Sequence, residues 1–544
     1  MLDTDETRDA VVRFMADPSS HPHHPTRVDH VQTHISHVFL AGPWVYKLKK
    51  AVQFPFLDFR TLAARRHFCD EELRLNRRLA EPVYVDVTAV VRRADGRFAL
   101  GGEGELVEPV LRMRRLPADR LLPALLAAGA VDAGMMEALA ARIAAFHRAA
   151  ATGPAVAAYA TPDAVRARFA ATLADAAGFA GSTLCAEEHA FLVAFADRFV
   201  ATHAPLLRAR QADGRIREGH GDLHAEHVCF VEHDPSAAPA PEALPAGIYV
   251  FDCIEFSQAF RCNDVASEIA FLTMDLECRG RRDLGDAFAA AYAKATNDAE
   301  LGTLLPYYAA HRAAVRALVA CLTSAEEEVA ADDRAAAARR AAAYLRLAVR
   351  SAWRADPPAI IACSGLSGTG KSAVAAELAD MTDYAWLRSD VIRRRGETGE
   401  GVEDRADLDR RAAQAARYTR AARTAVYEDL AREADRLLAA GRGVIADATF
   451  LARADRDRLA AVAARHGRPL VFLETDAPES IVRARLAARP ADDVSEARVE
   501  TYLAQRAARE PFGTDEVHAE VPTGGAVAAA RAAALRALRT MLGR

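Results

Sequence analysis

Cysteine is scarce in this chain: there are 8 in 544 residues, and no two of them form a Cys-X-X-Cys pair. Disulfide frameworks and zinc sites need closely spaced cysteines, so the sequence favours reduced thiols. No run reaches the roughly 18 uncharged apolar residues that a membrane span requires. Residues 1–6 are acidic and lack the basic and apolar regions of a signal peptide. We therefore expect a cytoplasmic protein with no membrane partner.

An excess of positive charge is also lacking. Lys and Arg number 70 and Asp and Glu number 75, so the net charge at pH 7 is −5. Without a general basic field, affinity for bulk nucleic acid is not implied, and a nucleic-acid partner is not expected. The chain is 51% hydrophobic and 27% charged, which is typical of a folded, soluble protein. Its length exceeds what one core supports and predicts two to four domains.

Residues 365–372 read Gly-Leu-Ser-Gly-Thr-Gly-Lys-Ser, a complete G-X-X-X-X-G-K-S phosphate-binding loop. The loop follows the apolar run 359–363 and precedes an Ala-rich helical pattern, which is the strand–loop–helix context that such a loop needs. We expect ATP here, with Lys371 on the β and γ phosphates and Ser372 ligating Mg²⁺. The expected nucleotide-binding residues are Gly365, Ser367, Gly368, Thr369, Gly370, Lys371 and Ser372.

Tandem prolines in residues 356–358 mark the best domain boundary, because they end a helix. After them, apolar runs alternate with helical stretches, which predicts a doubly wound parallel sheet. The runs are 360–363, 386–387, 444–446 and 470–473. Before the boundary, strands are expected within 31–60 and 83–113, and helices over 118–212 and 264–350. The predicted divisions are an N-terminal segment 1–24, a domain 25–350, a linker 351–358 and a domain 359–544.

Two acids follow predicted strands of the C-terminal domain, at the edge where such sheets bind ligands. Asp390 could orient or deprotonate an acceptor hydroxyl, and Arg393 could clamp an anionic group of the substrate. Asp447 could hold the Mg²⁺ hydration shell. Helix capping is the alternative reading of both acids. Farther along, Arg485 and Arg489 are one helical turn apart and could close over the transferring phosphate, although an Arg-rich solvated face is equally consistent with them.

Together these C-terminal features resemble the small P-loop kinases related to gluconate kinase, polynucleotide 5′-kinase and zeta toxins. The resemblance covers residues 359–510 and rests on the P-loop, on Ser389-Asp390-X-X-Arg393 and on the Asp-Ala-Thr-Phe segment 447–450. It implies transfer of the ATP γ-phosphate to a hydroxyl. Nothing in the sequence selects the acceptor, and we expect a small molecule.

The N-terminal domain places Asp222 in a loop, His-Gly-Asp-Leu-His-Ala-Glu-His over 220–227, and Asp252 at a later strand end. Two acids so placed suit phosphoryl transfer. The segment resembles the aminoglycoside phosphotransferase branch of the protein-kinase-like, two-lobed fold, whose loop reads H-G-D-X-X-X-X-N. The resemblance implies Asp222 as catalytic base and Asp252 as metal ligand. It also implies Lys47 on the phosphates, with Lys49 as an alternative, and Glu72 as the ion-pair partner ahead of Glu71.

One position departs from that pattern, because His227 stands where the family has a metal-binding Asn. Neutral imidazole is a poor ligand for Mg²⁺. The segment 41–43 is also too short to be a clear Gly-rich loop. An active kinase, a degenerate or regulatory pseudokinase, and a mistaken assignment all stay open for this domain.

The order of segments along the whole chain is similar to a bacterial family that fuses a phosphotransferase-like domain to a P-loop kinase domain. The matching segments include 33–40, 264–268 and 274–277. We therefore expect an ATP-dependent phosphotransferase acting on a small-molecule hydroxyl acceptor. The alternative is a nucleotide-switched regulator, with slow ATP hydrolysis and an N-terminal pseudokinase that recognises a protein partner. Phosphorylation of a nucleic-acid 5′-hydroxyl is a third hypothesis, against which the net charge argues.

Overall fold

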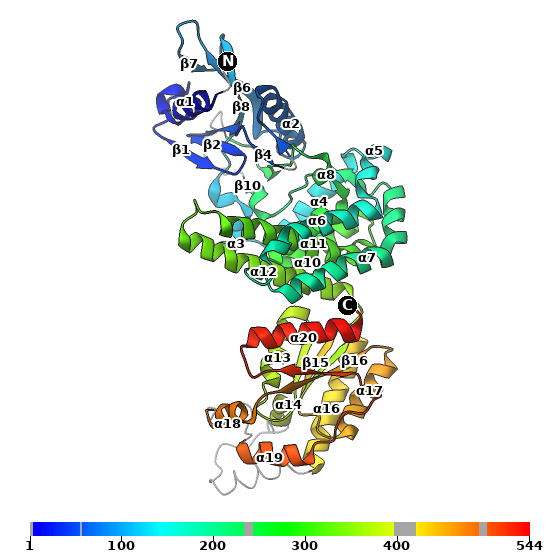
Figure 1. The fold of residues 1–544 in the computed structure, drawn as a ribbon. Helices are drawn as coiled ribbons and strands as arrows, with labels where there is room; N and C mark the ends of the chain where they lie inside the picture. Colours follow the sequence, from blue (N-terminus) through cyan, green and yellow to red (C-terminus); the bar gives the residue numbers. More distant parts are fainter. Residues whose placement is uncertain (1–3, 55–56, 233–242, 396–419, 489–497) are drawn as a thin grey trace, which may run out of the picture. The chain divides into compact units, whose positions relative to one another are not determined.

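The computed structural model describes residues 4–54, 57–232, 243–395, 420–488 and 498–544 (Figure 1). Its first sheet in chain order is six-stranded and antiparallel. The chain forms two compact units. Unit 1 comprises Met1–Val165 and Thr202–Ala309, and unit 2 comprises Arg166–Ala201 and Ala310–Arg544. These units do not coincide with the domains expected on either side of 351–358, and three helices contribute residues to both units. They are α6 (Pro162–Ala176), α7 (Ala186–Ala212) and α11 (Leu301–Ala325).

The sheet of unit 1 has the strand order β1-β2-β3-β8-β6-β7. The strands are β1 (Val28–Gln32), β2 (Ser36–Ala41), β3 (Trp44–Lys49), β6 (Tyr84–Arg92), β7 (Phe98–Leu100) and β8 (Glu105–Arg114). Helix α2 (Leu62–Ala80) packs on β6 and β8, and α1 (Asp5–Ala16) packs on β1 and β2. Residues two apart share a face of a strand, so Lys47 and Lys49 of β3 project toward the same side. This layer is the sheet-bearing part of unit 1.

The rest of unit 1 is mostly helical and contains three short strand pairs. The helices are α3 (Leu122–Ala127), α4 (Ala133–Ala149), α5 (Pro154–Ala157), α8 (Gln258–Arg261), α9 (Val265–Cys278) and α10 (Arg282–Thr296). The pairs are β4 (Gln53–Phe54) with β5 (Leu57–Asp58), β9 (Ile216–Glu218) with β12 (Cys262–Asp264), and β10 (Val228–Val231) with β11 (Gly247–Val250). Helix α10 packs on α4 and α9. The buried His147 bonds Tyr292 Oη at 2.7 Å and Glu268 Oε2 at 2.8 Å, so it is a satisfied core histidine.

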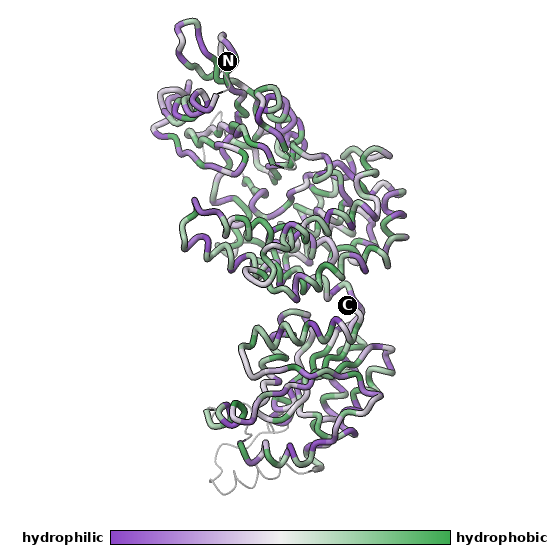
Figure 2. Tube along the Cα trace, viewed as in Figure 1, coloured by the Kyte–Doolittle hydropathy of each residue, from purple (hydrophilic) through white to green (hydrophobic). Residues whose placement is uncertain are grey.

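Unit 2 contains a five-stranded sheet with the order β14-β15-β13-β16-β17, and all of its pairings are parallel. The strands are β13 (Ile360–Ser364), β14 (Ala385–Arg388), β15 (Val444–Asp447), β16 (Leu470–Asp476) and β17 (His518–Pro522). The first four contain the predicted apolar runs, and their residues lie in the hydrophobic regions of the tube in Figure 2. Because parallel strands buried on both faces read as continuous apolar segments, the sequence predicted these four well.

Helices pack on both faces of this sheet, as a doubly wound fold requires. The helices that follow β13 are α13 (Lys371–Thr382), α14 (Ser389–Arg395), α16 (Arg420–Ala439), α17 (Arg453–Arg465), α18 (Glu479–Ala487), α19 (Val499–Ala508) and α20 (Val527–Leu542). Helices α13 and α20 pack together on one face, and α16 and α17 pack on the other (Figure 1). The core beside α16 includes Leu430, Leu437 and Phe472.

The segment 351–358, expected as a linker, is helical up to Ala355, where α12 (Ala331–Ala355) ends before the two prolines. Residues 351–355 are thus the last turn of a helix, and Trp353 in that turn is fully buried in unit 2. Its ring stacks on Phe191 with centroids 5.5 Å apart and meets Tyr384 edge-on at 5.9 Å. The Arg544 guanidinium lies 4.5 Å above it. A tryptophan so enclosed fixes the end of α12 to the sheet domain.

Within the described ranges, one helix has the length and apolar character of a membrane span. It is α7, whose best 18-residue window has a mean hydropathy of 1.3. A single such helix is weak support for a span, because core helices of folded proteins meet the same criteria. Its residues Phe191, Leu192 and Phe195 are buried inside the fold.

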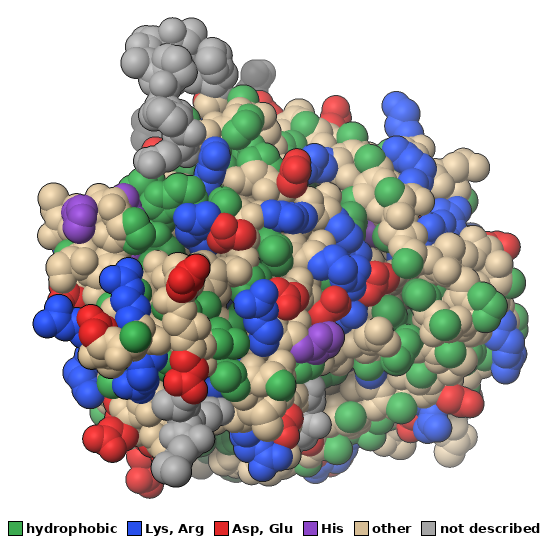
Figure 3. Space-filling view, turned by 90° about the horizontal axis from the view of Figure 1, so that it is seen from above, with side chains coloured by type: hydrophobic (Ala, Val, Ile, Leu, Met, Phe, Trp, Pro, Cys, Tyr) green, Lys and Arg blue, Asp and Glu red, His purple; other side chains and the backbone are tan. Residues whose placement is uncertain are grey.

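On the face drawn in Figure 3, acidic and basic side chains are interspersed. Many charged side chains form ion pairs on the surface, such as Arg66 with Asp70 at 3.1 Å and Arg74 with Glu71 at 2.8 Å. Exposed pairs of this kind contribute about 0–1 kcal/mol each, so the buried cores carry most of the stability.

Candidate active site

The phosphate-binding loop joins β13 to α13 and curls tightly against the neighbouring strand β16. Gly365 has φ +132°, and a Cβ there would lie 2.6 Å from the carbonyl oxygen of Thr475. No L side chain fits such an approach, so the glycine is required. Thr369 Oγ1 donates to Leu366 O at 2.8 Å and contacts Thr475 Oγ1 at 2.7 Å. These bonds hold the loop in one shape at the carboxyl edge of the sheet.

Two groups that the sequence assigns to phosphate have protein partners in this structure. Lys371 Nζ donates to Leu366 O at 2.8 Å, across its own loop. The backbone N–H of Ser367 donates to Gln505 Oε1 of α19 at 2.8 Å. A phosphate oxygen would have to replace both acceptors. Gln505 was not anticipated, since a single glutamine on a helix carries no motif.

Asp447 ends β15 directly beside the loop strand, in register with Cys363. Its side chain accepts a hydrogen bond from Trp386 Nε1 at 3.3 Å and lies near the Ser372 hydroxyl in the same cavity wall. Burial raises the pKa of the Asp447 carboxyl, and the nearby Lys371 ammonium opposes that rise. The structure therefore brings together the two oxygen donors that the sequence assigned to magnesium. Hydroxyl and carboxylate oxygens are ligands that fit Mg²⁺.

Asp390 and Arg393 lie in α14, which begins directly after β14. Arg393 Nη1 donates to Asp390 Oδ1 at 2.9 Å, and both side chains are half-buried. They share a wall of a cavity of about 690 Å³ with Lys371, Ser372 and Asp447. The expected acceptor residues and the expected phosphate residues thus line the same cavity.

Arg485 of α18 also lines this cavity. Its Nη2 donates to Thr523 O at 2.6 Å, whereas the buried Nη1 has no hydrogen-bond partner among the described residues. That nitrogen lies 3.4 Å from where a Cβ on Gly370 would be, so it faces the phosphate loop. Arg483 instead forms an exposed pair with Glu479 at 2.8 Å. Arg489, the other predicted lid arginine, lies outside the described residues.

Three further cavity residues were missed from the sequence. Arg423 of α16 pairs with Asp455 at 2.8 Å, and Tyr427 Oη contacts Thr449 Oγ1 at 3.1 Å. Thr523 follows β17 and precedes two glycines. The Thr-Gly-Gly turn after an apolar segment is a signal that could have been noticed, but helix residues such as Arg423 offer none.

In unit 1, the two lysines of β3 share one carboxylate on α2. Lys47 Nζ lies 2.8 Å from Glu72 Oε1 and 2.8 Å from Asp252 Oδ1. Lys49 Nζ lies 2.7 Å from Glu72 Oε2 and also pairs with Glu255. Although burial disfavours the ammonium, Asp252 and Glu72 hold the pKa of Lys47 well above its usual value. Both lysine alternatives thus join the ion-pair network.

The loop that carries Asp222 is fixed by a buried acid of α9. Glu268 accepts the N–H groups of His220 and of Gly221, the latter at 2.6 Å, and bonds His147. Although burial opposes it, these partners lower the pKa of Glu268 to about 2. A carboxylate that remains ionised at neutral pH can clamp a backbone turn in this way.

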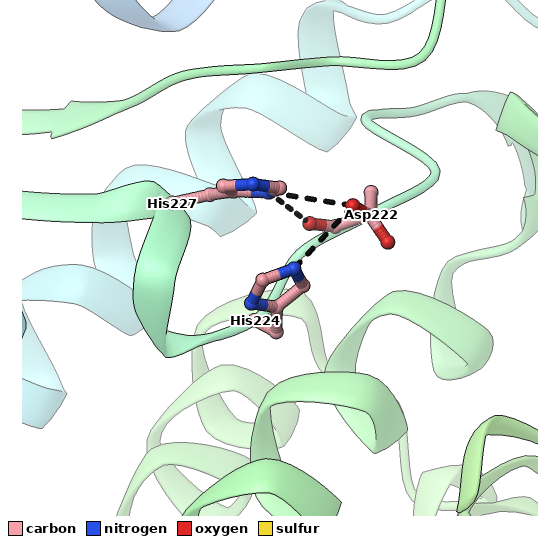
Figure 4. A group of neighbouring side chains, drawn as sticks. All are labelled: Asp222, His224 and His227. Carbon is pink, nitrogen blue, oxygen red and sulfur yellow. Dashed lines mark hydrogen bonds and ion pairs between the residues drawn. The ribbon is translucent and has the colours of Figure 1, made fainter. Parts of the chain in front are cut away.

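Asp222 lies next to two histidines, His224 and His227, whose rings both face it in Figure 4. Its Oδ2 is 3.4 Å from His224 Nε2 and 3.5 Å from His227 Nδ1, and His227 Nε2 is 3.5 Å from Asp252 Oδ2. Burial opposes ionisation of Asp222, yet the neighbouring imidazoles of His224 and His227 keep the pKa of its carboxyl below its usual range. Asp252 has φ +62°, an uncommon backbone conformation that is found at functional positions. The predicted base, metal ligand and phosphate lysine of unit 1 are therefore neighbours.

Comparisons with known proteins match the C-terminal part of the chain to a family and most of the chain to two relatives. The AAA domain family matches residues 360–512. Over 429 residues, 78% of this chain and 78% of each relative, the sequence is 31% identical to uncharacterized proteins of Mycobacterium tuberculosis and Mycobacterium bovis.

Solved structures with a similar fold are more distant. A gluconokinase from Sinorhizobium meliloti 1021 is 21% identical, with a TM-score of 0.27, over 34% of this chain and 95% of that one. A choline/ethanolamine kinase family protein from Mesorhizobium loti is 14% identical, with a TM-score of 0.34, over 62% and 98%. Likenesses at these scores carry no argument about the acceptor.

Proposed function

We propose that this chain, which belongs to the family of these mycobacterial proteins, is an ATP-dependent phosphotransferase that acts on the hydroxyl of a small molecule. One observation carries the proposal. A single cavity of about 690 Å³ is lined by the phosphate loop, by Asp390 and Arg393, by Asp447 and by Arg485. These residues come from separate elements far apart in the sequence, and together they provide anion-binding groups and a carboxylate beside an open space.

The phosphate end of ATP would lie on the loop, at the amino end of α13. Lys371 and the loop N–H groups would bind the phosphate oxygens, after Gln505 releases the N–H of Ser367. Ser372 and Asp447 would hold Mg²⁺, which neutralises phosphate charge when bound. Arg485 adds a guanidinium nitrogen that is already buried and directed at the loop. Its charge would stabilise the transferring phosphoryl group.

The acceptor hydroxyl would lie near Asp390 at the other side of the cavity. Its oxygen forms a bond to the γ-phosphorus, the bond from that phosphorus to the β,γ-bridging oxygen breaks, and ADP leaves. The proton of the hydroxyl passes to Asp390, which must first exchange its 2.9 Å bond with Arg393. Arg393 is then available for an anionic group of the substrate.

The proposal is tested by calorimetric titration of the intact chain with Mg²⁺ and a non-hydrolysable ATP analogue. We expect Lys371→Ala to abolish binding at one site and to abolish ATP turnover, because the ammonium has no replacement on the loop. Lys294→Ala is the matched control, since it removes the same charge from an exposed position of α10. Unchanged binding and turnover in Lys371→Ala would contradict the proposal.

An ATP-turnover assay, together with the titration, distinguishes the second hypothesis. Stimulation of ATP turnover by a small hydroxylated compound favours the kinase. Stimulation only by a protein would favour a nucleotide-switched regulator with unit 1 as the recognition module. A second binding site that survives Lys371→Ala would assign nucleotide binding to unit 1 as well.

A further inference from the structure

We propose that Asp222, His224 and His227 of unit 1 form a binding site for a divalent transition-metal ion, with Asp252 beside them. The site is separate from the phosphate loop, and the inference does not depend on the proposed function. One donor atom from each of the three residues lies within 4.8 Å of the others. Figure 4 shows the two imidazole rings next to each other, both facing Asp222.

The spacing of two pairs of donors fits ligands of one ion better than it fits direct hydrogen bonds. Asp222 Oδ2 lies 3.4 Å from His224 Nε2, and Asp252 Oδ2 lies 3.5 Å from His227 Nε2. Good N–H···O bonds are shorter, at about 2.7–3.2 Å. Two ligands that each lie about 2.0–2.1 Å from a tetrahedral zinc ion are about 3.3 Å apart. Both separations are close to that value.

Local backbone geometry explains why the two rings face the same way. Residues Ala225–His227 form a single 3₁₀ turn (η5), and His224 is its N-cap. In a 3₁₀ helix, side chains three residues apart eclipse each other. The centroids of the His224 and His227 rings accordingly lie only 4.0 Å apart. The N–H of Ala225 is tied to Asp275 Oδ2 at 3.0 Å, so the turn is held in place before any ligand arrives.

The neighbouring His220 shows what a purely structural histidine looks like in this loop. Its Nε2 bonds Phe251 O at 2.9 Å, and its Nδ1 accepts the N–H of Asp222 at 3.3 Å. His224 is equally buried, with 3% of its surface exposed, yet its Nδ1 has no hydrogen-bond partner in the described part of the chain. No protein acceptor or donor therefore fixes the tautomer of His224, so its Nε2 can present a lone pair beside Asp222.

His227 points to the same conclusion. Its Nδ1 lies 2.9 Å from the backbone carbonyl oxygen of Asp222. A carbonyl oxygen can only accept, so Nδ1 carries a proton and Nε2 is the nitrogen of His227 that can bind an ion. Nε2 lies 3.5 Å from Asp252 Oδ2, so an ion on Nε2 would also lie beside that carboxylate.

The donor set selects the kind of ion. Imidazole nitrogens suit zinc, cobalt and nickel, whereas Mg²⁺ prefers oxygen ligands in an octahedral shell. Two imidazoles with one or two carboxylates form the N and O ligand set that zinc takes in proteins. An ion bound here would hold Asp222 as a ligand, and that carboxylate would then be unable to accept the proton of an acceptor hydroxyl.

The test is a titration of the intact, chelator-treated chain with Zn²⁺ alone, read by calorimetry and by competition with a coloured chelator. We expect one site in unit 1 and a loss of at least tenfold in affinity for His224→Asn and for His227→Asn. Co²⁺ in place of Zn²⁺ should give visible d–d absorption that both variants lose. His67→Asn is the matched control, because it removes an exposed histidine of α2 in the same unit.

Two further measurements distinguish loss of the metal site from misfolding and from binding at another histidine pair. Far-UV circular dichroism checks that each variant is folded, and Asp222→Asn, which preserves shape, should also weaken Zn²⁺ binding. His37→Asn tests the rival pair His30 and His37, whose ring nitrogens lie 3.1 Å apart. Zn²⁺ affinity that is unchanged in folded His224 and His227 variants, or is lost only in His37→Asn, would overturn the proposal. Because no nucleotide is present, failure here leaves the phosphotransferase proposal untouched.

Discussion

Replacing Gly368 by alanine should destabilise unit 2 through the contact between the phosphate loop and α18. Gly368 has φ +84°, and a Cβ there would lie 2.9 Å from Leu486 Cγ and 3.0 Å from Val482 Cγ1. Both side chains are buried in the small core that also contains Tyr502, so neither has free space to move into. The added methyl group must therefore displace α18 or the loop.

The size of the effect follows from two separable costs. An L side chain at positive φ costs about 1–2 kcal/mol. Overpacking a filled core costs a further 1–3 kcal/mol or so, which gives about 2–5 kcal/mol for Gly368→Ala. Gly441, just past the end of α16, has φ +72° and nothing within 4 Å of a built Cβ. Gly441→Ala should show only the backbone cost, so the difference between the two variants measures the overlap.

Urea unfolding followed by tryptophan fluorescence can isolate unit 2. The chain has three tryptophans, and a Trp44→Phe background leaves Trp353 and Trp386, which both lie in unit 2. Gly368→Ala should also weaken binding of the ATP analogue, because α18 carries an arginine directed at the loop, while Gly441→Ala should not. Equal destabilisation by the two alanines would refute the packing argument.

Two other predictions concern His220 in unit 1 and Arg485 in unit 2. Burial lowers the pKa of His220 from 6.5 to about 4, so its contribution to the stability of unit 1 is complete above pH 6.5 and is lost as the pH falls toward 4. The loss amounts to about 3 kcal/mol, and a urea midpoint that is the same at pH 7.5 and pH 4.5 would contradict it. In unit 2, Arg485→Ala should weaken ATP-analogue binding by about 10- to 100-fold, the value of a charge-assisted hydrogen bond. Arg483→Ala, which breaks only an exposed pair, should change it less than twofold, and equal losses would contradict the assignment.

The sequence predicted those parts of the fold whose cause is local. Strand, loop and helix around Lys371 all follow from an apolar run, glycines and a helical pattern, and the structure has each of them. Asp447 at a strand end was found for the same reason, since parallel strands bring their carboxyl ends to one edge. From the sequence, Lys47 and Lys49 could be named only as alternative partners of Glu72, because strand periodicity puts both lysines on one face. In the structure both lysines pair with Glu72.

Other features depend on partners that are distant in sequence and were therefore not predictable. Trp353 makes residues 351–355 part of a buried helix, but its partners Phe191 and Tyr384 come from opposite sides of it in the chain. The contact of Gln505 with the Ser367 N–H joins residues 138 positions apart. Composition and periodicity describe single segments, so they predict neither of these contacts between distant residues.

The two sites differ in how their charges are satisfied, and the difference bears on what each can do. In unit 1, Lys47 Nζ lies 2.8 Å from a carboxylate oxygen of Glu72 and 2.8 Å from one of Asp252. A phosphate that binds Lys47 must therefore compete with strong ion pairs. In unit 2, the groups to be displaced from the loop are a neutral carbonyl and the amide of Gln505, and a buried Arg485 nitrogen has no partner among the described residues. Replacing neutral acceptors by a phosphate dianion strengthens the bonds, whereas breaking a buried ion pair weakens the network. Phosphate binding is therefore favoured at the P-loop, and the neighbouring histidines of unit 1 favour a metal ion there.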